Sequence, residues 1–147
     1  MPIGKNYINK IMTKKENRIS WVAAIISAVI MLQTLYFKFS ASPESVYIFT
    51  VLGLEPYGRI GIGIFELIAS VLLFIPRTRI FGAIIGVGLM AGACFSHLTK
   101  LGIVVLDDGG YLFALCIIVL SLCLVILYIE RDKIQTTIRS LLPFKSS

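Results

Sequence analysis

Four long runs of apolar residues dominate the chain, and each is long enough to cross a membrane as a helix. At 1.5 Å per residue, about twenty residues match a hydrocarbon core of about 30 Å. Glu66 in the second run and His97 in the third are the ionisable residues within them, apart from the run ends. The sequence predicts transmembrane helices, all in a single transmembrane domain of residues 1–147, over residues 19–38, 60–75, 80–99 and 109–129.

A shorter helix is expected between the first two runs, over about residues 43–53. Ser42 before Pro43 and Glu44 is typical of a helix start, and Gly53 is a natural stop. The second and third runs are separated by a very short turn, so their helices should be antiparallel neighbours. The predicted fold is all-α: a four-helix transmembrane bundle with a short extra helix in the first outer loop.

Composition supports a lipid environment. Residues of the hydrophobic class make up 57% of the chain and charged residues 15%. A water-soluble domain this small could not bury so much apolar surface, whereas lipid can cover it. The three cysteines lie in apolar stretches without a zinc-site spacing, which excludes a disulfide-stapled secreted scaffold.

The net charge of +6 reflects clusters beside the apolar runs, so the sequence predicts contact with a lipid bilayer and no nucleic-acid partner. A basic leader before an apolar run also describes a secretory signal, but the first run is longer than such signals, which favours a retained helix. Because cytoplasmic flanks carry the excess of Lys and Arg, we expect a multi-pass protein of the inner (cytoplasmic) membrane with both termini cytoplasmic. The cytoplasmic set is Lys5, Lys10, Lys14, Lys15, Arg18, Arg77, Arg79, Arg131, Lys133, Arg139 and Lys145, and the outer set is Lys38, Arg59 and Lys100.

Polar groups are expected to converge at the outer end of the bundle. An ionisable side chain within lipid is costly and generally has a partner or a function. Glu66 and His97 should lie at comparable depth on neighbouring helices, which makes them plausible partners, and Lys38 and Arg59 lie at helix ends on the same side. These four residues are the candidates for binding a ligand or handling a proton, while Glu66 with His97 could equally be a buried structural pair.

Cys94 and Cys116 give two open interpretations. Cys94 precedes His97 by three residues on one helical face, and Cys116 should reach a similar depth from the last helix. They are either small core residues or a thiol pair suited to redox work. No spacing indicates a metal site, so none is predicted.

The glycines of the third run form two overlapping G-x-x-x-G pairs, which let a second helix approach closely in lipid. They pack either within this bundle or at a homo-oligomer interface. The residues are Gly82, Gly86, Gly88 and Gly92.

Several segments together resemble the DoxX-like family of four-helix membrane proteins over roughly residues 20–129. They are the stretch 38–56, which runs from Lys-Phe-Ser to Gly-Leu-Glu-Pro, then Glu66, the turn 75–79 (Ile-Pro-Arg-Thr-Arg), and 91–98 (Ala-Gly-Ala-Cys-Phe-Ser-His-Leu). The resemblance implies Lys38, Glu66 and His97 as the matching polar positions. Named relatives include a subunit of a thiosulfate:quinone oxidoreductase, membrane partners of redox and thiol-stress enzymes, and more distant proteins that assist receptor assembly.

Two functional hypotheses follow. The first is a redox-associated inner-membrane protein that binds a quinone or similar small molecule near the outer face of the bundle. The second is a non-catalytic assembly or partner-binding subunit, with a redox enzyme or another membrane protein as its partner. A small-solute transporter is disfavoured, because four helices with so few buried polar groups make a poor pathway. The residues alone do not assign a catalytic group.

Overall fold

The computed structural model describes residues 12–141, and it describes side chains as far as residue 134. The described chain is helical with no strand, and four of its helices are long and apolar enough to cross a membrane. This confirms the predicted fold class, including the short extra helix. The elements are α1 Lys14–Phe39, α2 Pro43–Val51, α3 Tyr57–Phe74, α4 Arg79–Ser96, the π-helical turn η1 His97–Leu101 and α5 Tyr111–Leu141.

Local caps set several of the helix ends. α1 begins before position 19, because Thr13 and Glu16 form a capping box in which each side chain accepts from the other's backbone N–H. Ser42 caps α2 by accepting from the backbone N–H of Ser45, as its sequence predicts. Gly53 follows α2 with φ +72°, a left-handed conformation that suits glycine.

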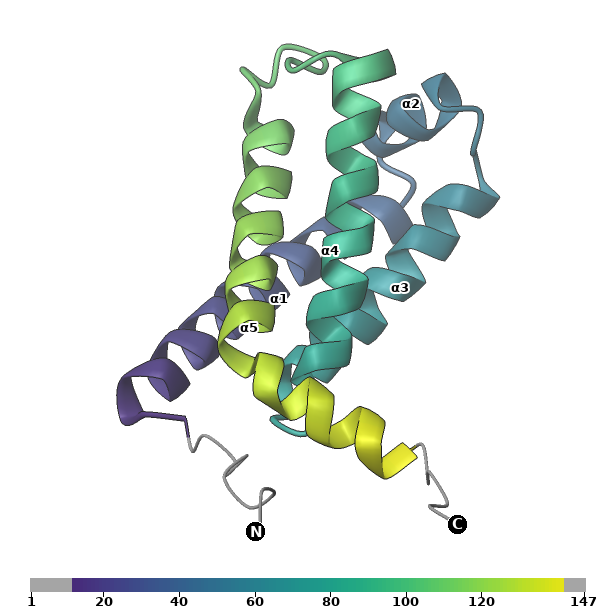
Figure 1. Cartoon of the computed structure of the whole chain (residues 1–147). Coiled ribbons are helices and arrows are strands. Elements are labelled where there is room, and N and C mark those ends of the chain that lie inside the picture. The colour runs from purple at the N-terminus through teal and green to yellow at the C-terminus, as the bar shows by residue number, and fades with distance from the viewer. Residues whose placement is uncertain (1–11, 142–147) are drawn as a thin grey trace, which may run out of the picture.

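The four long helices pack in a closed ring. α1 contacts α3 and α5, and α4 contacts α3 and α5, so each long helix touches two others. α1 begins and α5 ends at one end of the bundle, whereas α2 and the α4–α5 loop lie at the other (Figure 1). We call these the terminal end and the α2 end.

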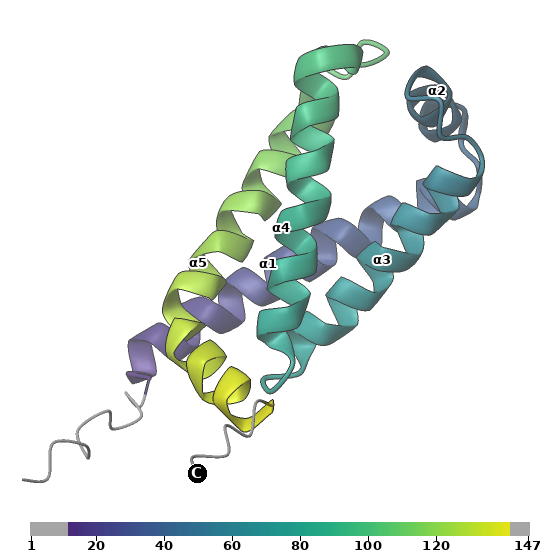
Figure 2. The same cartoon turned by 45° about the vertical axis from the view of Figure 1, so that its right-hand side comes forward.

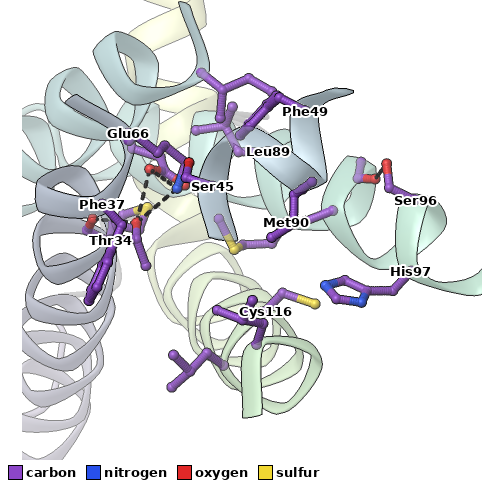
Figure 3. A pocket seen from close by; sticks show the side chains of 18 of the residues that line it. Thr34, Phe37, Ser45, Phe49, Glu66, Leu89, Met90, Ser96, His97 and Cys116 are labelled. Carbon is purple, nitrogen blue, oxygen red and sulfur yellow. Dashed lines mark hydrogen bonds and ion pairs between the residues drawn. The ribbon is translucent and has the colours of Figure 1, made fainter. Parts of the chain in front are cut away.

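Helix pairs α1/α3 and α4/α5 diverge toward the α2 end. Figure 2 shows α3 and α4 close together at the terminal end and spread apart near α2. Side chains from every helix line a pocket in this divergent half (Figure 3). The bundle is therefore tight at one end and open at the other.

The glycines of α4 follow the same gradient. A Cβ on Gly82 would come within 2.8 Å of the backbone of α3, and one on Gly86 within 2.8 Å of the Cys123 sulfur. Gly88 and Gly92 have open space where a Cβ would be, and both line the pocket. Gly82 and Gly86 therefore allow close packing inside the bundle, whereas Gly88 and Gly92 leave room in the pocket. A homo-oligomer through these glycines remains a prediction.

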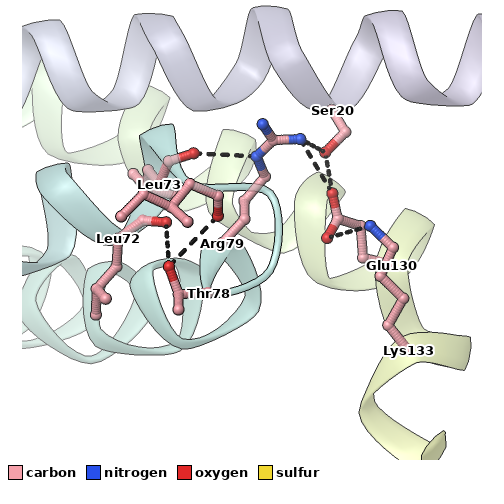
Figure 4. Close-up of polar contacts among 8 residues, drawn as sticks. Ser20, Leu72, Leu73, Thr78, Arg79, Glu130 and Lys133 are labelled. Atoms are coloured by element: carbon pink, nitrogen blue, oxygen red, sulfur yellow. Dashed lines mark hydrogen bonds and ion pairs between the residues drawn. The ribbon is translucent and has the colours of Figure 1, made fainter. Parts of the chain in front are cut away.

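A buried polar cluster joins three helices at the terminal end. Arg79 Nη1 lies 3.3 Å from Glu130 Oε1, and Ser20 donates to the same oxygen at 2.5 Å (Figure 4). Arg79 Nε donates to the Leu73 carbonyl at 3.0 Å, and its guanidinium lies 4.0 Å from the centre of the Trp21 ring. The cluster ties α1, α4 and α5 together where α1 begins.

Arg79 was counted in the cytoplasmic set as one of the basic residues beside the apolar runs, which does not say where its side chain points. Its side chain is fully buried and ion-paired. Glu130, the first charged residue after the last apolar run, is also buried, and its carboxylate pairs with the Arg79 guanidinium inside the bundle. Some other basic residues of the cytoplasmic set lie outside the part of the chain that the structure describes: Lys5, Lys10 and Lys145. The side chain of Arg139 also lies outside it.

Replacing Arg79 by methionine should destabilise the bundle by about 3 kcal/mol, because Glu130 would lose its buried partner. Thermal unfolding in detergent measures this. Arg77→Met, in the same turn but exposed, is the matched control and should change little. Equal unfolding temperatures for the two variants would contradict a stabilising role, and Arg79→Met combined with Glu130→Leu should recover part of the loss.

Candidate ligand pocket

A pocket of about 460 Å³ occupies the α2 end of the bundle. This volume falls in the range of about 300 to 1,000 Å³ that is typical of small-molecule sites. Its lining is mainly apolar, with a few polar side chains on facing walls. The apolar lining includes Ile30, Met31, Ile48, Phe49, Leu89, Met90, Leu112 and Leu115.

Lys38, Glu66 and Thr34 form the polar wall of the pocket on the α1/α3 side. Lys38 Nζ lies 2.9 Å from Glu66 Oε2 and donates to Thr34 Oγ1 at 3.1 Å. The Thr34 hydroxyl lies 3.1 Å from the same Glu66 oxygen. Figure 3 shows Thr34 and Glu66 on one side of the pocket. The buried carboxylate of α3 is thereby neutralised by a cation from α1, as burial of a charge requires.

Arg59 is close to this wall but does not line the pocket. Its guanidinium forms a two-pronged ion pair with Glu55, at 2.8 to 3.0 Å, and donates to the Lys38 carbonyl. The side chain is buried. Arg59 therefore fixes the end of α1 against the start of α3, and so holds Lys38 in place.

His97 lies on the opposite wall, and it is not the partner of Glu66. We expected these two residues to pair, but Glu66 is held by Lys38, and His97 lies across the pocket in Figure 3. A carbonyl oxygen can only accept, so His97 Nδ1 donates to the Gly102 carbonyl at 2.8 Å. That leaves Nε2 as the acceptor nitrogen of the neutral ring, while the ring packs edge-on against Phe113 at 5.5 Å between centres.

Cys94 and Cys116 meet between α4 and α5. Their sulfur atoms are 2.9 Å apart, both side chains are buried, and both thiols are free. Cys116 lines the pocket, and in Figure 3 its sulfur points toward the His97 ring. The two cysteines singled out in the sequence are therefore in contact, next to His97.

Asp108 organises the loop that follows η1. Its carboxylate accepts from the backbone N–H groups of Val105, Gly110 and Leu112 at 2.8 to 3.0 Å. Burial alone would raise the pKa of the Asp108 carboxyl. The three N–H donors outweigh that effect and hold the pKa of this carboxyl below the ordinary value.

Some pocket residues carry no signal in the sequence that would single them out. Thr34 and Ser45 are small polar residues in helices that the sequence identifies by their apolar residues. Glu44 lies in the first turn of α2, where an acidic residue is common for reasons unrelated to a pocket. Gln33 donates to the Tyr111 hydroxyl at 3.2 Å and bridges α1 to α5 at the pocket. Only the three-dimensional arrangement reveals that these side chains share a cavity with Lys38.

Among the described residues, no group of three or more His, Cys, Asp or Glu side chains is close enough to hold a metal ion. Glu66 in particular is engaged by Lys38 and lies across the pocket from His97.

The fold and the pocket define a multi-pass membrane protein: a four-helix bundle with a short helix beside a cavity at one end. A family model of DoxX-like proteins matches residues 22–125, most of the chain. The chain belongs to the DoxX-like family, which confirms the resemblance in its sequence. No curated protein and no solved structure matched it.

Changing Asp108 to asparagine should cost about 1 kcal/mol of stability at neutral pH, because the single oxygen of an asparagine side chain cannot replace both carboxylate oxygens as acceptors for the three N–H groups. Because the folded pKa is depressed, this stabilisation is complete above the unfolded value of about 3.9 and is lost as pH falls through the folded pKa. Thermal unfolding of both proteins between pH 7 and pH 3 tests this, and the gap should narrow below about pH 4.

Asp107→Asn is the control for that series. Asp107 is exposed and adopts φ +61°, which asparagine also tolerates. The Asp107 variant should unfold like the parent at every pH. A gap between parent and Asp108 variant that stays constant down to pH 3 would rule out the carboxylate as its source.

Proposed function

We propose that this DoxX-like protein binds the head group of an uncharged, lipid-soluble molecule of the quinone class in the pocket at the α2 end. The observation that carries the proposal is the pocket itself: an apolar cavity in a membrane protein with polar groups on two facing walls. A quinone needs both features, since its ring and tail are apolar and its two carbonyl oxygens accept hydrogen bonds.

The charges around the pocket favour a ligand without net charge. Lys38 is neutralised by Glu66, and Glu44 adds a further carboxylate to the lining. Within the described part of the chain, no second Lys or Arg lines the pocket. An anionic ligand such as a phosphate would therefore meet more negative than positive charge, whereas a neutral carbonyl compound would not.

The two polar walls suit the two ends of a para-quinone. Lys38 Nζ carries three N–H donors, of which Thr34 and Glu66 engage two. The third can donate to one ligand carbonyl. On the other wall, His97 Nε2 is an acceptor, which fits the hydroxyl of the reduced, hydroquinone form. Glu66 and His97 would then handle protons at opposite ends of the ligand rather than as a pair.

Filling the cavity should block binding. Gly92→Leu places a side chain in open space inside the pocket, so we expect affinity for a short-chain quinone to fall by about tenfold or more, which corresponds to about 1.4 kcal/mol. Gly61→Leu is the matched control, because Gly61 also has open space around it but does not line the pocket. Equilibrium dialysis against protein in lipid nanodiscs gives both affinities, and equal values for the two variants would refute this pocket as the site.

We also propose that the protein lies in the inner membrane with its terminal end in the cytoplasm. Arg77 in the turn before α4 and Lys14, Lys15 and Arg18 at the start of α1 support this orientation, and a four-span bundle puts both ends on one side. A reporter that is active only in the cytoplasm should work when fused after Ser147. An inactive fusion in a folded protein would reverse the topology, and with it the side on which the pocket lies.

A further inference from the structure

Two thiols in contact beside a ligand pocket form a unit that the binding function does not use. Cys94 and Cys116 come from neighbouring helices, and their sulfurs are 2.9 Å apart. A disulfide requires about 2.05 Å, so the sulfurs need to move roughly 0.9 Å closer. No barrier of intervening atoms separates them.

We propose that Cys94 and Cys116 are a redox-active dithiol that a quinone bound in the pocket oxidises to a disulfide. This inference rests on the proposed function, because the quinone is the oxidant. It assigns the protein an electron-transfer half-reaction in addition to ligand binding.

The position of the two sulfurs gives them different parts in this reaction. Cys116 lines the pocket and can meet the ligand directly, whereas Cys94 does not line the pocket and contacts the Cys116 sulfur from α4. Cys123 lies in the same apolar core and provides a comparison, because it is a buried cysteine outside the pocket. It is fully buried under Gly86 and is not part of the pocket lining.

The reaction balances between the dithiol and the quinone. The Cys116 sulfur bonds to the quinone ring, and its proton passes through His97 Nε2, the free acceptor of the neutral ring, to one quinone oxygen. The Cys94 sulfur then attacks the Cys116 sulfur, the S–S bond forms and the bond from sulfur to the ring breaks. The released electron pair and the Cys94 proton complete the hydroquinone. Two thiols and one quinone become one disulfide and one hydroquinone.

His97 is placed for its part by the loop that follows it. Its Nδ1 is held by the Gly102 carbonyl, so the acceptor nitrogen is on the other side of the ring. In Figure 3 the Cys116 sulfur points toward this ring. A thiol is nucleophilic only as the thiolate, so a nearby base is what this reaction needs.

Counting thiols before and after oxidation tests the proposal. The purified protein in nanodiscs is reduced, freed of reductant and mixed without oxygen with one equivalent of a short-chain quinone. It is then denatured and its remaining thiols are alkylated for mass spectrometry. Three alkylated cysteines should fall to one, Cys123, with a Cys94–Cys116 disulfide-linked peptide and one hydroquinone per protein by ultraviolet absorbance.

Three variants sharpen the result, and quinone binding is measured on each by dialysis. Cys123→Ser should still lose two thiols. Cys116→Ser should lose none, whereas Cys94→Ser should lose only Cys116, which stays bonded to the quinone ring because no second thiol resolves the adduct. Both of these variants should remain folded and release no hydroquinone. His97→Gln should slow the loss without changing its final extent.

The outcomes separate this inference from the function on which it rests. Quinone that binds while all three thiols stay reducible overturns the dithiol and leaves the binding function standing. Quinone that neither binds nor oxidises overturns both. Loss of Cys123, or of all three thiols alike, indicates unspecific oxidation and also contradicts the proposal.

Discussion

The ion pair between Lys38 and Glu66 is the interaction on which the α2 end of this bundle depends. Glu66 lies within a membrane-spanning helix, where an unpaired carboxylate is costly. Its partner comes from α1 at 2.9 Å, so α1 and α3 must stay together at this depth. Arg59 reinforces the arrangement by binding the Lys38 carbonyl. The pair stabilises one wall of the pocket and makes that wall polar.

The opposite end of the bundle is closed by different means. Gly82 lets α4 approach the backbone of α3, and Arg79 is buried against Glu130 and Ser20. Helices held together there can diverge toward α2 without separating. The pocket is thus a consequence of close packing at one end and of an ion pair that joins α1 to α3, but not to α4, at the other.

Much of the fold was predictable because lipid imposes simple rules on sequence. Runs of about twenty apolar residues define spans, and Ser42 with Pro43 marks the start of the short helix. The partners of buried charges were harder to infer. The sequence indicates how deep Glu66 lies in the membrane but not the direction in which its side chain points. His97 and Lys38 were therefore both at a depth where either could have been its partner. The burial of Arg79 was missed for the same reason, since a charged residue beside an apolar run can face water or point into the bundle.

The proposed quinone would meet polar groups on two facing walls of an apolar cavity. The most direct measurement is photolabelling with a quinone that carries a photoreactive group on its ring, followed by peptide mapping. The account predicts labelled sites on the pocket faces of α1 and α4, around Thr34 and Gly92, that disappear with excess unlabelled quinone. Labelling spread over lipid-facing residues such as Phe65 and Leu124, without competition, would contradict it.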